Sequence, residues 1–456
     1  MSSPKAEKTK QDVLQRYLAR TSTSRELNEK AKKFIPGGDT RALSFYRPYP
    51  FYAVEGKGCY LHDADGNSYL DLLNNMTSLI HGHAHPHVVQ AIHQQVAQGI
   101  CHGVPVEAQA KLAEHICRRV ASVGTLRFTN TGSEATLFCM RAARAFTGKD
   151  AILKLDGGYH GNHDFVQVNP SPDIHAQGLP RPQRTKGVPA CVEQELFVVP
   201  FNDLEAAEQI LKAHQDRIAA IIMEPMLGAG GGLPPREGYL KGMRELADRY
   251  GVLLIFDEII SFRLHEGGLQ TLAGVKPDLT AFGKIIGGGF PVGAFGGRKD
   301  IMDLFDPLRS DGISHSGTFT GNAVTMVAGT ANLEIYGQQE VDRIGRLGDR
   351  LAAGLNQTFE TIGIPGQTRG LGSLIGIAFT DKPLTTSRDV VLALAKTGEL
   401  LHFLHLELLN RGIFFMGRGM FVVSTPMTEK DIDQAVRIFG EVLEVVKPIA
   451  EDVLAK

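Results

Sequence analysis

The feature that most constrains this chain is a unit repeated through its middle: a short apolar run, a polar or glycine-rich break, and an amphipathic stretch. Several of the runs are apolar throughout, as expected of strands that helices cover on both faces of a mostly parallel sheet. The pattern therefore predicts an α/β fold, in which ligands bind beyond the carboxyl ends of the strands. The predicted strands are 126–129, 151–155, 196–199, 219–223, 252–256, 279–282 and 293–296.

The two ends of the chain follow other patterns. The first residues are rich in helix formers and predict a helical arm, and a stretch that alternates around two turn signals indicates a small antiparallel meander. In the last quarter, helical and strand patterns are mixed. We therefore expect three parts: 1–80, an N-terminal arm and small antiparallel segment; 81–335, a large α/β domain; and 336–456, a C-terminal small α+β domain.

Composition narrows the classes of partner. The chain has 48 basic and 50 acidic residues, so no sequence-wide field favours nucleic acid or an anionic membrane. Its five cysteines are scattered and odd in number, which favours reduced thiols and hence the cytoplasm. No apolar run is long enough to span a bilayer, and the N-terminus has no apolar leader. We expect a cytoplasmic protein that binds neither nucleic acid nor membrane.

Three polar residues stand where apolar runs end: Glu224, Asp257 and Lys284. The carboxyl ends of parallel strands share one edge of a sheet, so we expect these side chains to converge there. A carboxylate buried at such a position is costly unless it meets a cation or a donor. Asp257 in particular requires a positively charged or protonated partner, and a protonated pyridine nitrogen is one.

Lys284 lies in a glycine-rich stretch and is flanked by apolar residues. Such surroundings disfavour the charged form of lysine, and Schiff-base chemistry requires a neutral amine. The alternative is a surface lysine whose stem emerges from a flexible loop. A Walker A phosphate loop is excluded, because Asp278 replaces its first glycine and Ile285 replaces its Ser or Thr.

Residues 128–135 predict a strand, a glycine turn and the start of a helix. The free amides and dipole of such a helix start bind phosphate, with the hydroxyls of Thr131 and Ser133 as further donors. An ordinary N-cap is the alternative interpretation. Tyr159 follows in a second glycine-rich turn and offers an aromatic face for a planar ring, although it fits a packed core equally well.

Six motifs in one order carry a resemblance to a known family. Together they resemble the class III aminotransferases over roughly residues 36–446. Within that family the chain resembles the branch that contains glutamate-1-semialdehyde aminomutase, and there it is most similar to aminotransferases for aromatic β-amino acids such as β-phenylalanine. The motifs are Thr131-Gly132-Ser133-Glu134-Ala135, Gly158-Tyr159-His160-Gly161, Glu224-Pro225, Asp257-Glu258-Ile259, Gly283 to Gly289, and Ser316 to Asn322.

The resemblance implies fold type I, with pyridoxal 5'-phosphate (PLP) bound by the large domain, and a homodimer with shared active sites. It implies that Lys284 forms the Schiff base with the cofactor and carries the proton during the reaction. It implies that Asp257 pairs with the pyridinium nitrogen and keeps the ring an electron sink. By this resemblance the donor would be an amino acid, such as an aromatic β-amino acid, and the acceptor would be a keto acid such as 2-oxoglutarate or pyruvate.

The resemblance also assigns the other contacts of the cofactor. One ring face would stack on Tyr159 and the other would pack on Ile259, while Glu224 supports the site. The phosphate would be held at the helix start and by Thr318 of the second subunit. The implied cofactor-binding set is Thr131, Gly132, Ser133, Tyr159, Glu224, Asp257, Ile259, Lys284 and Thr318.

A transaminase must anchor a substrate carboxylate, and a bidentate arginine does this best. By resemblance, Arg41 matches the N-terminal carboxylate-binding arginine of the aminomutase branch, and Arg418 matches a second arginine of β-amino-acid aminotransferases. The aminomutase pattern has a glutamate near Arg418 or Gly419, which this chain lacks. An aminomutase remains the alternative function, followed by decarboxylase or racemase activity and by a non-catalytic PLP-fold binding protein.

Alternating histidines suggest a metal site, since imidazoles two residues apart share one face of a strand. Pro86 interrupts any such strand, and no second group of ligands is evident. We therefore expect no metal. The four residues are His81, His83, His85 and His87.

Overall fold

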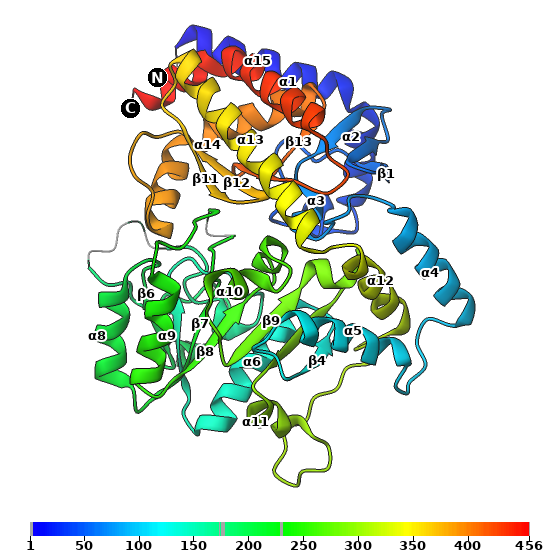
Figure 1. The fold of residues 1–456 in the computed structure, drawn as a ribbon. Coiled ribbons are helices and arrows are strands. Elements are labelled where there is room, and N and C mark those ends of the chain that lie inside the picture. Colours follow the sequence, from blue (N-terminus) through cyan, green and yellow to red (C-terminus); the bar gives the residue numbers. More distant parts are fainter. Residues whose placement is uncertain (1–2, 173, 175–177, 229–230, 456) are drawn as a thin grey trace. The chain divides into compact units, whose positions relative to one another are not determined.

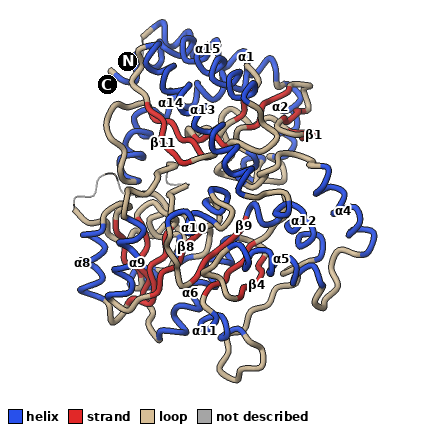
Figure 2. The backbone as a smooth tube through the Cα atoms, in the orientation of Figure 1, coloured by secondary structure: helices blue, strands red, loops and turns tan. Residues whose placement is uncertain are grey.

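The computed structural model describes residues 3–172, 174, 178–228 and 231–455, and the chain divides into two compact units. Unit 1 contains Met1–His85, Asp342–Pro383 and Leu392–Lys456, and unit 2 contains Pro86–Val341 and Leu384–Val391. Figure 1 shows both units coloured along the sequence, and Figure 2 distinguishes their helices from their strands. The three-part division of the chain stays a prediction.

A seven-stranded sheet forms the centre of unit 2, in the order β4-β10-β9-β8-β7-β5-β6. The pairs from β9 to β6 are parallel, whereas β10 runs antiparallel to both of its neighbours. The sequence predicted all seven strands to within one residue at each end, and the mostly parallel α/β fold is confirmed. The strands are β4 Thr125–Thr129, β5 Ala151–Leu155, β6 Leu196–Val199, β7 Ile218–Met223, β8 Leu253–Asp257, β9 Leu279–Gly283 and β10 Gly293–Gly297.

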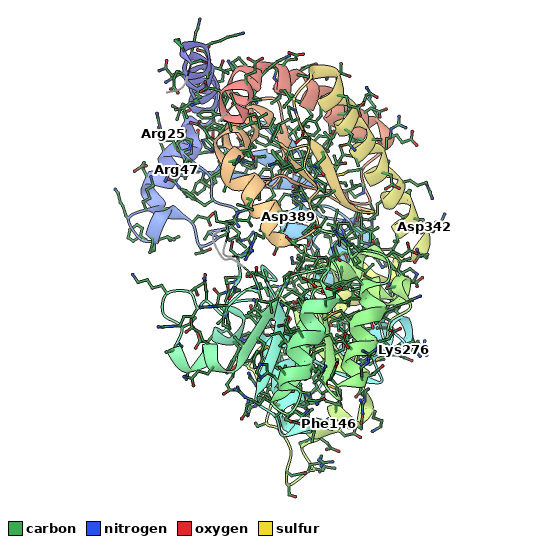
Figure 3. All side chains as sticks on the ribbon, turned by 90° about the vertical axis from the view of Figure 1, so that its left-hand side faces the viewer. Arg25, Arg47, Phe146, Lys276, Asp342 and Asp389 are labelled. Carbon is green, nitrogen blue, oxygen red and sulfur yellow. The ribbon has the colours of Figure 1, made fainter. Side chains whose placement is uncertain are left out.

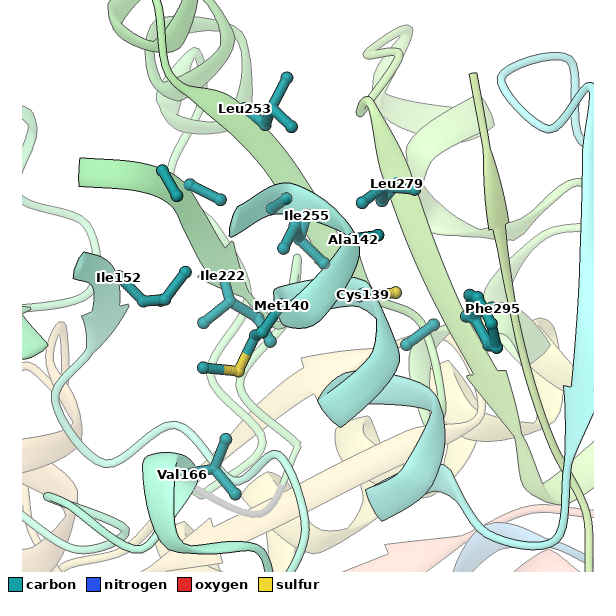
Figure 4. Packing of buried hydrophobic residues seen from close by; sticks show 14 of the residues in the cluster. Cys139, Met140, Ala142, Ile152, Val166, Ile222, Leu253, Ile255, Leu279 and Phe295 are labelled. Atoms are coloured by element: carbon teal, nitrogen blue, oxygen red, sulfur yellow. The ribbon is translucent and has the colours of Figure 1, made fainter. Parts of the chain in front are cut away.

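Both faces of this sheet are covered, because every residue of β5, β7, β8, β9 and β10 is buried. Helix α6, Gly132–Thr147, contacts β7, β8, β9 and β10. Its small residues let it approach the sheet closely, and Figure 4 shows Cys139, Met140 and Ala142 facing Ile222 and Ile255. Burial of each isoleucine side chain contributes about 1.5–3 kcal/mol of transfer free energy. The packed sheet therefore supports the residues at its carboxyl edge.

The remaining helices of unit 2 flank the sheet (Figure 1). Phe146 near the end of α6 and Lys276 before β9 carry partly or fully exposed side chains on the surface of this unit (Figure 3). The helices are α4 Pro86–Gln98, α5 Glu107–Arg119, α7 Ala190–Gln194, α8 Leu204–His214, α9 Tyr239–Arg249, α10 Gly268–Ala273, α11 Lys299–Met302 and α12 Ala323–Glu334, with 3-10 turns at Asp164–Val166, Ser261–Leu264, Lys284–Gly287 and Asp303–Phe305.

Unit 1 holds two small sheets, β1-β2-β3-β13 and β11-β12-β14. The predicted antiparallel meander corresponds to β1, β2 and β3, and β13 adds to it in parallel with β3. The strands are β1 Ala53–Lys57, β2 Tyr60–Asp63, β3 Ser68–Asp71, β11 Gln367–Leu371, β12 Leu374–Ala378, β13 Ile413–Phe414 and β14 Met420–Val422.

The helices of unit 1 include the predicted N-terminal arm, which breaks into two helices at Thr21. The closing helix begins with a capping box, in which Thr428 and Asp431 each satisfy the other's backbone amide. None of the helices in the described residues combines the length and apolar character needed to cross a bilayer. The helices are α1 Pro4–Arg20, α2 Ser22–Ala31, a 3-10 turn Pro36–Gly38, α3 Asn74–Thr77, α13 Gln338–Ile362, α14 Ser387–Asn410 and α15 Glu429–Leu454, of which α13 and α14 begin in residues of unit 2.

Candidate active site

The three polar residues at strand ends lie on neighbouring strands of the large sheet. Glu224 directly follows β7, Asp257 is the last residue of β8, and Lys284 directly follows β9. Strands β7, β8 and β9 are adjacent and parallel, and Asp257 is paired in register with Ala281. The structure thus brings these three side chains to one carboxyl edge of the sheet.

Burial and charge set the protonation of the amine. Burial lowers the pKa of Lys284 to about 8, against the opposing effect of the Glu224 and Asp257 carboxylates. Burial also raises the pKa of Glu224 to about 8, with Asp257 adding to the rise and Lys284 opposing it. An amine with a pKa near 8 has a sizeable neutral fraction at physiological pH, as a nucleophilic lysine requires.

The backbone at the lysine is strained. Lys284 has a φ of 52°, a left-handed conformation that costs a residue with a side chain on the order of 1–3 kcal/mol. The buried Ile285 and Ile286 that follow hold this turn in place. Strain of this kind persists where the surrounding structure enforces it, and it is concentrated at functional sites.

Glu224 is held by two backbone amides. Its Oε1 accepts a hydrogen bond from Tyr159 N at 3.0 Å, and its Oε2 accepts one from Gly228 N at 3.0 Å. Both carboxylate oxygens are therefore used within the protein. This arrangement ties the turn that carries Tyr159 to the end of β7.

Asp257 has a partner that sequence reasoning did not identify. Its Oδ2 lies 2.8 Å from Nδ1 of His160, and its Oδ1 accepts a hydrogen bond from Ile259 N at 3.1 Å. Both side chains are buried, and burial lowers the pKa of His160, so the imidazole is neutral and Nδ1–H donates to the carboxylate. The two residues are 97 positions apart in the sequence, which explains why no local signal revealed the pair.

The start of α6 has the features of an anion site. Thr131 is the N-cap, and its Oγ1 accepts a hydrogen bond from Glu134 N, while the Glu134 carboxylate turns back to Asn130 N. The Ser133 hydroxyl oxygen accepts from Asn162 N at 3.1 Å. Because both hydroxyl groups act as acceptors in these bonds, their protons are available to a phosphate at the helix start.

Two glycines make room for Ile259. A Cβ at Gly132 would lie 2.5 Å from Ile259 Cδ1, and one at Gly283 would lie 3.3 Å from Ile259 Cγ2. The isoleucine side chain therefore sits against the start of α6 and against the residue before Lys284. Tyr159 is half-buried, and its charge environment includes Asp257 and Glu224.

Thr318 is exposed in a loop. Thr320 of the same loop accepts a hydrogen bond from Asn130 Nδ2 at 3.5 Å. Phe319 beside Thr318 is 62% exposed, which is unusual for a phenylalanine in a loop.

Arg41 lies in unit 1 beside a strained element. Its Nη1 donates to Asn75 Oδ1 at 2.6 Å. The four residues of α3 have φ values of 51°, 47°, 56° and 74°, so this is a left-handed turn made without glycine. Arg41 and Asn75 line a cavity of about 480 Å³.

Arg418 lies at the tip of a tight turn in unit 1. Met416 and Met420 pair across this turn, and Gly419 has the φ of 89° that closes it. Arg418 is exposed, and within the described residues no carboxylate pairs with it. It lines a second cavity, of about 180 Å³, which shares Tyr46, Leu73 and Phe414 with the cavity of Arg41.

The alternating histidines have partners other than a metal. His81 Nδ1 lies 2.7 Å from Thr425 Oγ1, His83 Nε2 lies 2.7 Å from Asp71 Oδ2, and His87 Nε2 lies 3.2 Å from Glu334 Oε2. Within the described ranges, no group of three or more metal-ligating side chains is assembled.

Comparison with known proteins identifies the family. The family described as Aminotransferase class-III matches residues 44–443, nearly the whole chain. The chain belongs to the class III aminotransferases. Enzymes of this family depend on PLP, and a solved relative is a transaminase with PLP bound, so the chain is a PLP-dependent enzyme.

Similar class III enzymes have more than one activity. A glutamate-1-semialdehyde 2,1-aminomutase of Methanothrix thermoacetophila is 41% identical over 86% of this chain and 89% of its own length. The crystal structure of an omega-transaminase from Sphaerobacter thermophilus has 40% identity and a TM-score of 0.88, covering 93% of this chain and 98% of its own. A beta-phenylalanine aminotransferase from Variovorax paradoxus has 34% identity and a TM-score of 0.88, covering 96% and 97%.

The residues of unit 2 fit the cofactor of class III enzymes. At the start of α6, backbone amides and hydroxyl protons can bind a phosphate. The carboxylate of Asp257, which His160 holds through Oδ2, can pair with a pyridinium nitrogen. An aldehyde finds the weakly basic amine of Lys284. The observation that decides the fit is the buried, histidine-anchored carboxylate beside a lysine with a lowered pKa.

Proposed function

We propose that this class III enzyme transfers the amino group of an aromatic β-amino acid to a keto acid such as 2-oxoglutarate or pyruvate. The observation that supports this most is the cavity of Arg418. Its walls include Phe45, Tyr46, Phe414 and Phe415, and none of its lining residues is a carboxylate. A guanidinium beside aromatic walls suits a substrate that carries an aromatic ring and a carboxylate.

Arg41 supplies the second guanidinium. We assign it the carboxylate of the amino donor or of the keto acid, because it lines a cavity that adjoins the one of Arg418. Its bond to Asn75 fixes one Nη group and leaves the rest of the fork for a ligand. Two such arginines fit an enzyme whose two substrates differ in where their carboxylates lie.

The chemistry belongs to the large sheet of unit 2. When bound, PLP supplies an electrophilic aldehyde and an electron sink. Lys284 would hold the aldehyde through its neutral amine and would then move a proton on the substrate. Asp257 would pair with the protonated ring nitrogen, and His160 orients Asp257 through the bond to its Oδ2.

Further residues are assigned to holding the cofactor. Thr131, Gly132 and Ser133 bind the phosphate at the start of α6, as the available hydroxyl protons support. Tyr159 and Ile259 enclose the two ring faces. Glu224 supports the site by holding the turn of Tyr159.

We propose that the enzyme is a cytoplasmic homodimer in which Thr318 binds the phosphate of the partner's cofactor. Support comes from exposed apolar side chains in unit 2: Ile100 at 56%, Val104 at 67%, Leu308 at 92% and Phe319 at 62% exposure. Exposed apolar side chains become buried when two copies of a chain associate, which favours binding. All five cysteines are free thiols, which suits a reducing compartment.

Glutamate-1-semialdehyde aminomutase activity is the second candidate, because two relatives with that name are 41% and 38% identical to this chain. An aminomutase moves nitrogen within one substrate and passes through a species with two amino groups. Two ammonium groups call for a carboxylate near the substrate. The cavity of Arg418 has none among its lining residues, whereas Asp39 and Asp71 line the adjoining cavity of Arg41.

The test is a pair of product assays on purified holoenzyme. With 3-amino-3-phenylpropanoate and 2-oxoglutarate or pyruvate, we expect a β-keto acid together with glutamate or alanine. With glutamate 1-semialdehyde, we expect no internal rearrangement. Rearrangement without β-keto acid formation would replace the proposal with the aminomutase.

Lys284→Ala is the matching variant, and it should abolish turnover because Lys284 is the residue to which we assign the reacting amine. Lys276→Ala serves as its control, since Lys276 is exposed on the surface of the same unit (Figure 3). Substantial activity of Lys284→Ala would contradict the role of the lysine.

A further inference from the structure

A lysine without a role in the chemistry above is buried inside the large sheet of unit 2. Lys154 lies in β5 between Leu153 and Leu155, and its side chain is 0% exposed. Burying an amine or an ammonium group is unfavourable unless its protons meet acceptors. The contacts of Lys154 must therefore offset this cost.

The amine of Lys154 contacts three backbone carbonyls. Nζ donates to Val168 O at 2.6 Å, to Gly158 O at 3.2 Å and to Asn169 O at 3.2 Å. Three oxygens match the three protons of an ammonium group. Burial lowers the pKa of Lys154 to about 7, against the opposing effect of two nearby carboxylates. Above that pH, the neutral amine still has two protons for these oxygens.

These carbonyls belong to the two ends of one loop, residues 156–169, which follows β5 and carries Tyr159. One carbonyl lies directly before Tyr159, and the other two lie at the end of the loop. The two ends also contact each other, since Gly157 N donates to Asn169 O at 3.1 Å. Asn169 has a φ of 48°, a left-handed conformation that the surrounding structure must enforce. Lys154 thus ties the start of the loop to its end.

Other side chains hold the turn at the start of this loop. The Thr136 hydroxyl donates to His160 O at 2.6 Å, and the Gln167 amide donates to Gly161 O at 2.8 Å. Each of these donors holds one carbonyl of the turn. Lys154 differs from them, because it holds both ends of the loop at once and does so from within the sheet.

The loop carries two residues with assigned contacts at the cofactor. Tyr159 encloses one ring face in the proposed site, and His160 donates to Asp257 Oδ2 at 2.8 Å. Both residues stand within two positions of Gly158, whose carbonyl Lys154 holds. A shift of this turn would therefore displace a ring contact and the partner of the carboxylate together, and such contacts depend on the residues that support them.

We propose that Lys154 is a positioning residue of the cofactor site, which clamps the two ends of loop 156–169 so that the turn of Tyr159 and His160 is formed before PLP binds. The inference rests on the roles that the proposed function gives to these two residues, but not on the choice of amino donor. Lys154 itself needs no contact with the cofactor or the substrate.

PLP titration of two apoenzyme variants tests the clamp. Lys154→Met keeps the length of the side chain and removes its protons, so it should raise the apparent Kd of PLP about tenfold, the value of roughly one hydrogen bond. Lys149→Met is the matched control, because Lys149 precedes the other end of β5 and donates to Gln215 O at 2.8 Å and to Gly251 O at 3.4 Å. Both variants should lower the Tm, but only Lys154→Met should weaken PLP binding. Wild-type affinity in Lys154→Met, or an equal loss in the control, overturns the proposal.

Amide hydrogen exchange of the apoenzyme tests the clamp without the cofactor. The amides of residues 156–159 all donate hydrogen bonds, so their exchange reports how often the turn opens. We expect slow exchange in the wild type, about tenfold faster exchange in Lys154→Met, and no change in Lys149→Met. Unchanged exchange in Lys154→Met overturns the proposal. Should that variant not fold, the wild type decides, since a turn that exchanges as fast as an unfolded peptide in the apoenzyme overturns it as well.

These two readouts separate the inference from the proposed function. A holoenzyme that forms no β-keto acid from 3-amino-3-phenylpropanoate contradicts the proposed function, but this result changes neither PLP affinity nor hydrogen exchange. Wild-type values of both readouts in Lys154→Met contradict the clamp even where the wild-type enzyme forms the β-keto acid.

Discussion

At the scale of single residues, three ionisable side chains at one edge of the sheet interact with one another. Asp257 keeps its place because His160 donates to one oxygen and Ile259 N donates to the other. Burial of Glu224, together with the nearby charge of Asp257, raises the pKa of Glu224, and burial lowers the pKa of Lys284. The same low-polarity surroundings that make the carboxylates costly make the amine reactive.

The lowered pKa of Lys284 predicts a pH dependence. With a pKa of about 8, roughly 10% of the amine is neutral at pH 7, whereas an ordinary lysine is neutral in less than about 0.1%. The rate at which apoenzyme binds PLP covalently should therefore rise up to about pH 8 and then level off. Stopped-flow absorbance between pH 6 and 11 measures it.

The same shift fixes the sign of a stability effect. The pKa of Lys284 in the folded apoenzyme lies below the ordinary value of 10.5, so the protonated amine lowers the free energy of unfolding. This loss of stability is complete below about pH 8 and disappears as the pH rises to 10.5. A binding rate that keeps rising to pH 10.5 would show that the amine titrates as an ordinary surface lysine.

At the scale of elements, helix and turn ends do the positioning. The start of α6 is capped by Thr131, and its first turn stands against Ile259 through Gly132. In unit 1, the left-handed turn of α3 presents Asn75 to Arg41. The capped start of α6 has a fixed geometry, and the left-handed turn of α3 has a cost in free energy. Each of these local structures adjoins residues to which we assign ligand contacts.

Thr131→Ala tests the start of α6. Loss of the N-cap should destabilise the helix by about 1 kcal/mol, since an alanine cannot accept the hydrogen bond from Glu134 N. Loss of a hydroxyl donor to a phosphate should weaken PLP binding roughly tenfold. Thermal unfolding of the apoenzyme and PLP titration measure the two effects.

Thr131→Ser is the matched control, because serine caps a helix as well as threonine does. It should preserve both stability and affinity. Wild-type affinity for PLP in Thr131→Ala would remove the hydroxyl from the phosphate site while leaving its role as a cap.

At the scale of the whole molecule, the assigned roles are divided between the two units. The residues assigned to the cofactor lie in unit 2, within the large sheet and its loops, whereas Arg41 and Arg418 lie in unit 1. In our proposal, substrate preference is therefore carried by other parts of the chain than the cofactor chemistry. Relatives of one fold are named as aminomutases and as transaminases, as expected when function depends on the site and not on the fold.

Arg41→Gln and Arg418→Gln test this division. Each should lower kcat/KM for 3-amino-3-phenylpropanoate by roughly 10-fold to 100-fold, the value of a charge-assisted hydrogen bond, while PLP absorbance stays unchanged. A donor without a carboxylate, 1-phenylethylamine, should be affected little. Steady-state kinetics with both donors measures the effects.

Arg47→Gln is the control, because Arg47 is an exposed arginine of the same segment and lines neither cavity (Figure 3). It should leave both donors unaffected. Equal losses on the acid and the amine in Arg41→Gln or Arg418→Gln would contradict carboxylate binding.

Much of unit 2 was predictable from the sequence, because its strands are buried on both faces. Burial on both faces requires continuous apolar runs, and such runs reveal where strands end and which polar residues follow them. Lys284, Asp257 and Glu224 were found in this way, and the ordered motifs then indicated the family. The sequence also predicted the glycine turn before α6, because a phosphate site and an N-cap share one local pattern.

Only the tertiary structure could decide which residues meet across the chain. The bond from His160 to Asp257 joins residues 97 positions apart, and no local pattern records it. The same holds for Ile259 between Gly132 and Gly283 and for the left-handed turn beside Arg41. Apolar periodicity is a property of one segment, whereas the partners of a buried polar group come from several segments packed together.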